Sequence, residues 1–454
     1  MENKDTITQK EFLYLMIPFI FSAVTQPLLG AVDVAVVGQL NNANYISGVS
    51  IGALIFNTIY WVFGFLRVST TAFSAQSIEW KSKEKASDAF FRPLFTACII
   101  SFLIIILQNI IFKGSMKFIN PEIEIQKIVN IYFKILVWGA PLVLCNYVIL
   151  GWLMGQGNIK GSVMMQMSSN VLNIILDIFF VTIMDLKVEG VAIATLISQG
   201  ISTCLGIYFI IPYKYEKFFN IRSILDKKEL RKVLSGNKDL MIRTICLLIH
   251  DNMIMAASAT LGGWILSTNA VLLHILEMIS YSFEGLANAS SVFSGRAVGR
   301  RNKELMKATW KKTIQWGIVF AVFTSGIFTL FSSSIVKMFT DIPEIISLSE
   351  KYGFWIIIFP FAGVLGLTFY GVFTGAGATF PVMVSTVGAF IAFFFSWKFI
   401  IPIYENNGIW FSLMTFYFFR GAFLVPNLKN LLKKYNVEKG YCIVLILTVT
   451  FFIA

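Results

Sequence analysis

Twelve apolar runs, each followed by a polar link, account for most of the chain. A helix that crosses the hydrocarbon core of a bilayer needs about 20 predominantly apolar residues, and each run can supply most or all of such a helix. The runs are continuous and do not alternate over segments of about 10 residues, which excludes an outer-membrane barrel. The sequence therefore predicts an all-α polytopic membrane protein with 12 transmembrane helices, at residues 12–38, 46–74, 90–112, 128–152, 161–183, 189–212, 239–262, 267–294, 313–335, 352–374, 381–402 and 408–425.

Charged residues make up 14% of the 454 residues, against about 25% in soluble domains, so a large soluble domain is excluded. The net charge of +12 does not indicate nucleic acid as a partner. Most Lys and Arg residues stand in links between apolar runs, where positive charge marks the cytoplasmic side of a membrane. We therefore expect a multi-pass protein of the plasma membrane, in a bacterium the inner membrane, with membrane lipid around it and both termini in the cytoplasm.

The two halves of the chain repeat one pattern at a nearly constant offset in the sequence. Phe73-Ser74-Ala75-Gln76 corresponds to Phe293-Ser294-Gly295-Arg296, and Gly155-Gln156-Gly157 corresponds to Gly375-Ala376-Gly377. Six spans per copy predict two pseudo-symmetric six-helix lobes related by an axis along the membrane normal, an architecture of transporters. The expected organisation is an N-lobe at 1–212, a cytoplasmic inter-lobe linker at 213–238, a C-lobe at 239–425, and at 426–454 a cytoplasmic basic tail with a short apolar end.

Two aspartates, Asp33 and Asp177, are expected to lie deep within spans of the first lobe. Burial disfavours the charged form of a carboxyl group, so both are expected to take up and release protons near neutral pH. Asn173 lies one helical turn from Asp177, and Thr195 in the next span adds another neutral oxygen, so the same group could instead coordinate Na⁺. These four residues form the predicted coupling site, with H⁺ or Na⁺ as the coupling ion; no cofactor and no other metal is expected.

Other polar residues recur at helical spacing, which places them on one face of a span. They are candidates for the lining of a substrate cavity, although hydrogen bonding between packed helices or internal ion pairs would also explain them. In the first half they are Gln26, Asn57, Trp61, Asn170 and Gln199, and in the second half His274, Glu277, Tyr281, Glu284 and Asn288.

Two prolines interrupt the first span. Pro18 and Pro27 each remove a backbone hydrogen bond and push on the preceding turn. The sequence therefore predicts a hinge in this helix, with fixed kinks as the alternative.

Several motifs resemble one known family. The stretch Thr25-Gln26-Pro27-Leu28-Leu29-Gly30-Ala31-Val32-Asp33 and the stretch Phe63-Gly64-Phe65-Leu66-Arg67 are similar to the multidrug and toxic compound extrusion (MATE) family in its DNA-damage-inducible (DinF-like) branch. The resemblance implies a two-lobe antiporter, not an enzyme, that exports organic cations or other toxic compounds. It also implies the family's first-lobe ion site at Asp33, Asn173, Asp177 and Thr195, with the first-helix proline at Pro18. His274 and Glu284 depart from the residues that the branch leads us to expect.

The sequence as a whole predicts a secondary active multidrug efflux antiporter that works by alternating access. The buried aspartates would attract a small amphipathic cation and release it when H⁺ or Na⁺ binds. A lipid-linked oligosaccharide flippase of the same superfamily is an alternative, for which Arg67 and Arg420 are the basic candidates, and a non-transporting membrane receptor is an alternative of another class. The chain is expected to be a monomer.

Overall fold

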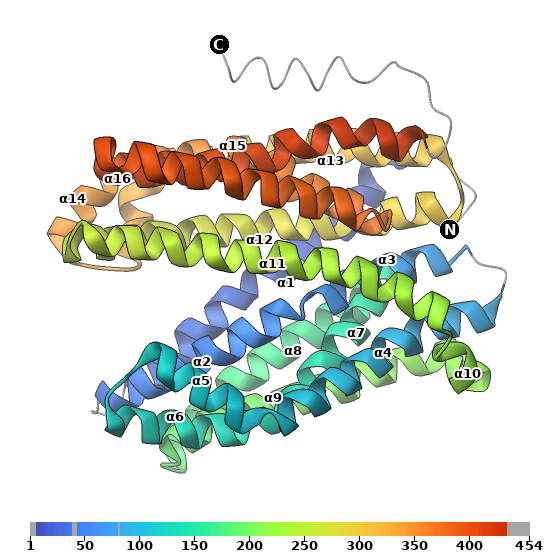
Figure 1. Ribbon diagram of the computed structural model, residues 1–454, viewed down its shortest axis with the longest axis horizontal. Coiled ribbons are helices and arrows are strands. Elements are labelled where there is room, and N and C mark those ends of the chain that lie inside the picture. The colour runs from blue at the N-terminus through green and yellow to red at the C-terminus, as the bar shows by residue number, and fades with distance from the viewer. Residues whose placement is uncertain (1–5, 39–42, 80–81, 434–454) are drawn as a thin grey trace. The chain divides into compact units, whose positions relative to one another are not determined.

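The computed structural model describes residues 6–38, 43–79 and 82–433, and within them it leaves out the side chains of 27–35, 37–38, 43, 216, 228–236, 429–430 and 432–433. The regular elements in these ranges are helices (Figure 1). They fall into two compact units, which we call the N-terminal unit, residues 21–237, and the C-terminal unit, residues 1–20 with 238–454. The predicted apolar end at 441–454 lies outside the described residues.

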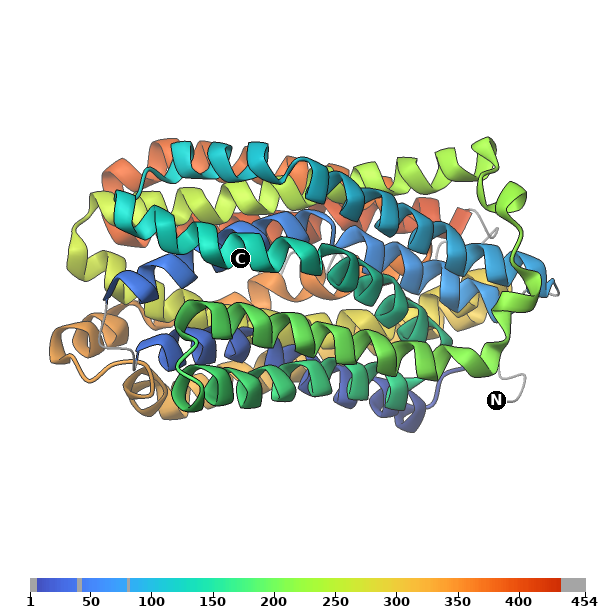
Figure 2. The same ribbon diagram turned by 90° about the horizontal axis from the view of Figure 1, so that it is seen from below.

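The N-terminal unit holds predicted spans two to six. Three of these spans are each built from two helices, because a short non-α segment interrupts them: Gly64 between α2 and α3, Leu107 between α4 and α5, and a 3-10 turn at Val137–Gly139 before α7. Helices α8 and α9 lie side by side along their length, as the green ribbons of Figure 2 show. The bounds are α2 Ala43–Val62, α3 Phe65–Ser77, α4 Lys83–Ile106, α5 Gln108–Ile119, α6 Ile123–Leu136, α7 Ala140–Gln156, α8 Ile159–Ile178, α9 Lys187–Ile210 and α10 Ile221–Ile224.

The C-terminal unit consists mainly of long helices, and α11, the helix that leads into it from the N-terminal unit, begins earlier than the sequence predicts. Helix α11 begins at Lys227, inside the predicted linker at 213–238, so the linker is helical over its second part. Helix α16 runs through both of the last two predicted spans, with non-helical backbone at Glu405, whose φ is 48° and ψ is −122°. The bounds are α11 Lys227–Thr260, α12 Gly263–Gly299, α13 Lys303–Lys337, α14 Pro343–Tyr352, α15 Phe354–Gly375 and α16 Thr379–Lys433.

Helix α1, Gln9–Gly38, contributes to both units. Its first half packs within the C-terminal unit, where the ring of Phe12 stacks on Phe293 at a centroid distance of 5.7 Å. There Gln9 also bonds to the side chains of Gln315 and Trp316 on α13. The division falls between Ile20 and Phe21, so the compact units differ from the predicted N-lobe, which begins at residue 1.

Within the described residues, ten helical segments are long and apolar enough to cross a membrane. The chain is therefore an all-helical polytopic membrane protein. The number differs from the twelve predicted spans for two reasons. The predicted spans 381–402 and 408–425 form one helical segment, Thr379–Leu428, and the predicted span 12–38 is not among the ten.

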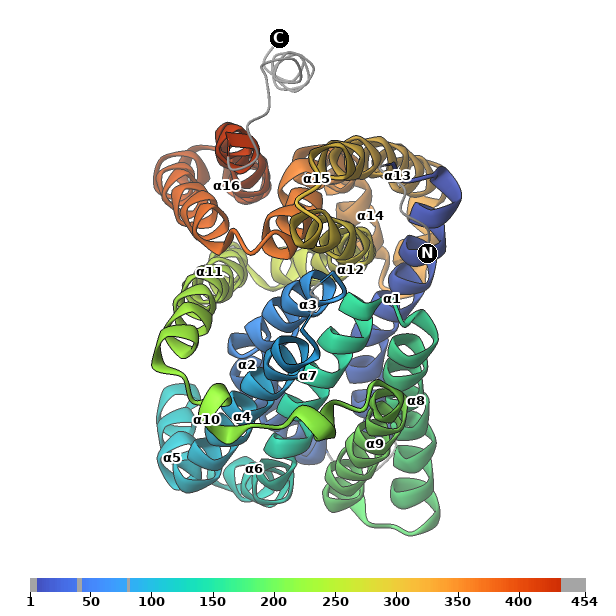
Figure 3. The same ribbon diagram turned by 90° about the vertical axis from the view of Figure 1, so that its right-hand side faces the viewer.

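The contact between α3 and α7 recurs between α12 and α15, and Figure 3 shows each pair lying together. The Ser74 hydroxyl donates a hydrogen bond of 2.6 Å to the carbonyl of Trp152. At the offset that relates the two halves of the sequence, the Ser294 hydroxyl donates a hydrogen bond of 2.6 Å to the carbonyl of Val372. Both halves therefore build the same helix pair.

Two glycines spaced four apart allow the helices of each pair to approach closely. They are Gly151 and Gly155 on α7, and Gly371 and Gly375 on α15. A methyl group at Gly151 would lie 2.4 Å from the carbonyl oxygen of Arg67, and one at Gly371 would lie 1.9 Å from that of Ala287. The second contact again lies at the same offset from the first. Such GxxxG spacing is used where membrane helices associate through backbone packing.

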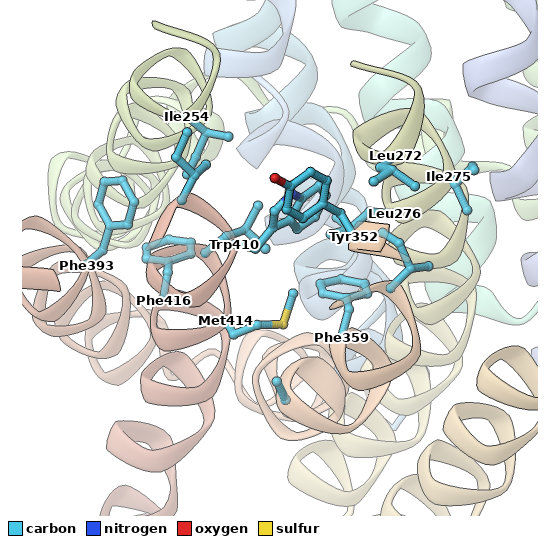
Figure 4. Packing of buried hydrophobic residues seen from close by; sticks show 14 of the residues in the cluster. Ile254, Leu272, Ile275, Leu276, Tyr352, Phe359, Phe393, Trp410, Met414 and Phe416 are labelled. Atoms are coloured by element: carbon cyan, nitrogen blue, oxygen red, sulfur yellow. The ribbon is translucent and has the colours of Figure 1, made fainter. Parts of the chain in front are cut away.

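The largest apolar core of the C-terminal unit lies between α11, α12, α15 and α16. Trp410, Phe359 and Phe416 belong to it, and Figure 4 shows Phe416 beside Phe393, with Leu272 and Ile275 on the opposite side of the cluster. These side chains are fully or almost fully buried. The core holds α16 against the other three helices.

We expect Gly371→Ala to destabilise the protein, because the new methyl group has no room beside the Ala287 carbonyl. Overpacking of this kind costs about 1–3 kcal/mol. Thermal unfolding in detergent should show a lower midpoint. Gly326→Ala on α13 is the matched control, because nothing lies within 4 Å of its added methyl group, and it should unfold no earlier than the wild type. Equal midpoints for the two variants would contradict the packing argument.

Candidate functional site

Three of the four residues predicted to bind the coupling ion come together in the N-terminal unit. Asn173 and Asp177 lie one turn apart on α8 and are 1% and 0% exposed. The Asn173 amide donates to a carboxylate oxygen of Asp177 at 3.0 Å and lies 3.5 Å from the Thr195 hydroxyl on α9. That hydroxyl donates to the carbonyl of Val191 at 3.0 Å, so its lone pairs remain to accept. We call these three residues the Asp177 cluster.

The Asp177 cluster presents oxygen atoms inside an apolar span. The side-chain oxygen of Asn173 is buried and has no hydrogen-bond partner among the described residues. A buried carbonyl oxygen without a donor is costly unless a cation or a donor reaches it. An oxygen-only set of this kind suits a proton on the carboxylate or a hard cation such as Na⁺.

The fourth predicted residue, Asp33, lies on α1 within the range Gln9–Gly38. Its side chain is outside the described part of the chain, as is that of Pro27. Their predicted roles therefore stay predictions.

Helix α1 is connected to α8 by two hydrogen bonds within the N-terminal unit. The hydroxyl of Ser22 bonds to the amide oxygen of Gln166, and the amide of Asn170 donates to the hydroxyl of Thr25 at 2.8 Å. Asn170, predicted as a cavity residue, is therefore bonded between helices. Ser22 and Thr25 lie three residues apart on one helical face, a spacing that could have identified them as the partners.

A second buried network joins α7 to α9. The amide of Asn146 donates to the side-chain oxygen of Gln199 at 2.8 Å, and the hydroxyl of Thr203 donates to the side-chain oxygen of Asn146 at 2.8 Å. Gln199 is thus a bonded residue in the described structure. Asn146 was not predicted, because it stands alone in an apolar run and has no polar neighbour at helical spacing.

The other predicted cavity residues lie apart from these networks. Asn57 and Trp61 are exposed on α2, and Gln26 is exposed on α1. In the C-terminal unit, His274 and Glu277 are exposed on α12 with 3.7 Å between ring nitrogen and carboxylate oxygen. Further along α12 lie Tyr281, Glu284 and Asn288, which are partly buried. None of these side chains takes part in the hydrogen bonds of the Asp177 cluster given above.

The described helices define an all-helical, multi-pass membrane protein, and the family that its sequence matches consists of transporters and not of enzymes. The sequence matches the MatE family model over residues 18–179 and 240–397. The chain belongs to this family, and the resemblance to the MATE family seen in its motifs is confirmed.

Three similar proteins illustrate the match. DNA damage-inducible protein F of Escherichia coli (strain K12) is 29% identical over 426 residues, which is 92% of each chain. A probable multidrug resistance protein NorM of Photorhabdus laumondii is 23% identical and covers 78% of each chain. The outward-facing structure of a multidrug resistance MATE family transporter of the MOP superfamily has a TM-score of 0.80 at 19% identity, and the match covers 93% of this chain and 96% of that chain.

We expect Asn173→Leu to destabilise the protein by about 1–3 kcal/mol, because it removes the amide that donates to buried Asp177. A hydrogen bond to a charged acceptor is stronger than one to a neutral acceptor. The loss should therefore grow as the pH rises and Asp177 ionises, which thermal unfolding in detergent at several pH values would measure.

Asn146→Leu is the matched control for this experiment. It removes the same side chain from a network whose described partners, Gln199 and Thr203, are neutral. We expect it to destabilise the protein by an amount that does not change with pH. The interpretation of the Asp177 cluster would be wrong if the two variants showed the same pH dependence.

Proposed function

We propose that the chain is a secondary active multidrug efflux antiporter that exchanges an organic cation for H⁺ or Na⁺ at the Asp177 cluster. The observation that carries this proposal is a fully buried carboxylate within a span, bonded to an amide that itself lies 3.5 Å from a hydroxyl. Ionisable groups inside a membrane are costly to keep, so they mark ion or substrate pathways by default.

The topology proposed for this function has twelve crossings in two six-helix lobes, in a bacterial inner membrane with both termini in the cytoplasm. Ten segments qualify as spans among the described residues. One of them, Thr379–Leu428, divides at the non-helical backbone of Glu405 into two stretches. Helix α1, with 30 residues, supplies the remaining crossing.

The substrate class follows from the charge of the cluster and from the relatives. An ionised carboxylate in a low-dielectric site attracts a small amphipathic cation more strongly than it would in water. Relatives that cover most of this chain are described as multidrug resistance proteins. We therefore expect organic cations of varied shape to be carried, by a monomer.

In the proposed exchange, the organic cation and the coupling ion compete for the negative charge of the buried aspartates. Protonation of Asp177 and Asp33, or entry of Na⁺, removes the attraction that holds the organic cation. Because α1 is bonded to α8 through Ser22 and Thr25, a change at the cluster can act on α1. The bend is proposed at Pro18 and Pro27, and the membrane potential adds about 2.3 kcal/mol per charge per 100 mV.

The flippase alternative finds less support in the basic residues. Arg420 is buried, and its guanidinium lies 5.6 Å from the ring centre of Phe416 and 5.5 Å from that of Tyr417. Stacking on neighbouring aromatic rings favours a structural role for this arginine. The receptor alternative gives no reason to keep a buried carboxylate cluster.

We expect uptake of a fluorescent organic cation into proteoliposomes under an imposed acid-inside pH gradient or an imposed Na⁺ gradient. One gradient should drive uptake, and that result names the coupling ion. Asp177→Asn should reduce gradient-driven uptake to the level of empty liposomes, because the neutral side chain can neither attract the cation nor exchange it. Asp33→Asn tests the residue on α1 in the same way.

Asp185→Asn is the matched control, since it makes the same chemical change at an exposed residue beyond the end of α8. It should retain uptake. The proposal fails if Asp177→Asn transports as well as the wild type under the gradient that drives the wild type.

A further inference from the structure

Two arginines come together inside the C-terminal unit. Arg420 on α16 is 4% exposed, and Arg243 on α11 is partly buried. The two are within electrostatic range of each other, and Arg420 is also within range of Tyr370 on α15. The guanidinium of Arg243 lies 4.0 Å from the centre of the same Tyr370 ring. We call Arg243 and Arg420 the arginine pair.

The N–H donors of the arginine pair have no acceptor in the described part of the chain. No hydrogen bond or ion pair joins either guanidinium to another described residue, and the Nε of Arg243 is buried without a partner. The rings of Phe416 and Tyr417 hold the Arg420 guanidinium in place at 5.6 and 5.5 Å. Ring faces stabilise the positive charge, but they do not satisfy the donors as an oxygen atom would. Buried donors without an acceptor are costly to keep.

The carboxylates around the arginine pair have other partners. Asp239, one turn before Arg243 on α11, accepts a hydrogen bond of 2.8 Å from a hydroxyl at the start of α16. Asp251 is within electrostatic range of Arg420, but its oxygen lies 2.8 Å from the histidine beside it. Glu277 on α12 lies 3.7 Å from a histidine one turn earlier. Buried charges in proteins are paired, so the arginine pair indicates that an anion supplies the missing partner.

The first half of the chain has no charge at the place that corresponds to Arg420. Glu189-Gly190-Val191 corresponds to Asn407-Gly408-Ile409, so Arg420 stands where the first half has Ser202. The hydroxyl of Ser202 donates a hydrogen bond of 3.0 Å to the carbonyl of Met165. A small bonded residue is therefore sufficient for packing at this place in the fold, and packing alone does not explain the arginine.

The arginine pair lies near one end of the segments that can span a membrane. Arg243 is about 9 Å inside the segment Asn237–Thr260, at 1.5 Å per residue. Tyr370 is in the last two turns of α15, Phe354–Gly375, and Arg420 is near the end of the segment Thr379–Leu428. Long basic side chains close to the end of a span reach the level of the lipid headgroups. Basic pockets between helices at that level bind phosphate groups.

We propose that Arg243 and Arg420 form a binding site for one phosphate group, which a membrane phospholipid or a soluble phosphate supplies. Arginine presents its donors in a planar fork that pairs with two phosphate oxygens at once. A phosphate group held by both side chains would offset their charges and connect α11 to α16. The proposal goes beyond the antiport function, and it does not require the phosphate compound to be transported.

Thermal unfolding of the full-length protein in detergent micelles tests the site, because a ligand that binds the folded state raises the unfolding midpoint. Dioleoylphosphatidylglycerol added to the micelles is the lipid probe, and dioleoylglycerol, which has the same acyl chains without the phosphate, is its control. Inorganic phosphate is the soluble probe, compared with chloride at the same ionic strength. We expect at least one probe to raise the midpoint, and that probe names the source of the phosphate group.

Variants connect the rise in midpoint to the arginine pair. Arg243→Gln and Arg420→Gln should each weaken binding by about tenfold or more, because each removes a charged donor. Arg222→Gln is the matched control, since it makes the same change at an exposed arginine on α10, and it should keep the full rise. Each rise is measured from the variant's own midpoint without ligand, so a variant that is only less stable does not imitate the effect.

Three results would overturn the proposal. They are no rise with either probe, an equal rise with dioleoylglycerol and dioleoylphosphatidylglycerol in the absence of an effect of inorganic phosphate, and an equal response of Arg243→Gln and Arg222→Gln. None of these measurements uses a gradient, so their outcome is independent of the uptake experiment on Asp177.

Discussion

Close backbone packing between pairs of helices is the constraint on which the rest of this structure depends. Apolar surface gives no net drive for helix association in lipid, so packing and interhelical hydrogen bonds must supply it. The chain meets this need twice, with glycines at 151 and 371 against a neighbouring carbonyl and a serine hydroxyl bonded to the opposite helix. Helix α7 of the first pair also packs against α8 and α9, which carry the Asp177 cluster.

The packing repeats at one constant offset between the two halves of the sequence, but the chemistry does not. The counterpart of Asn173 in the second half is Phe393, whose ring meets His250 edge-on. The position that carries an amide in one unit thus carries part of an aromatic cage in the other. The C-terminal unit has an ionisable pair, His250 and Asp251, on α11 instead, the helix that corresponds in chain order to α1, where Asp33 lies. The two halves therefore share a carboxylate on the first helix of each repeat, whereas Asp177 on the fifth span of the first half corresponds to Trp397 in the second half.

The sequence predicted an all-helical membrane protein and placed Asn173 one turn from Asp177, because each of these depends on a regular spacing; the count of twelve spans and the ion-binding role of the Asp177 cluster stay predictions. Asn173 and Asp177 lie one turn apart on α8, so helical geometry alone brings them near each other, and Thr195 comes near because α9 packs beside α8. Asn146 escaped prediction because its partners Gln199 and Thr203 are on another helix, and contacts between helices are set by packing. The start of α11 was not predicted for a different reason. The charged residues at 227–238 resemble a linker, although Lys, Glu, Arg and Leu are good helix formers.

Helix α1 is the element that belongs to both compact units. Its first half packs by Phe12 on Phe293 in the C-terminal unit, and from Ser22 onward it bonds to α8 in the N-terminal unit. Pro18 precedes the change from one unit to the other by two residues, and proline removes the backbone bond that would stiffen a helix there. In the mechanism proposed above, a proton at the Asp177 cluster would act on the segment beyond this proline, which is bonded to α8, and not on the segment before it, which packs on α12 through Phe12. Asn170, which bonds to Thr25 of α1, lies one turn of α8 from Asn173. In the proposed mechanism, loss of this bond would therefore separate ion binding from movement of α1.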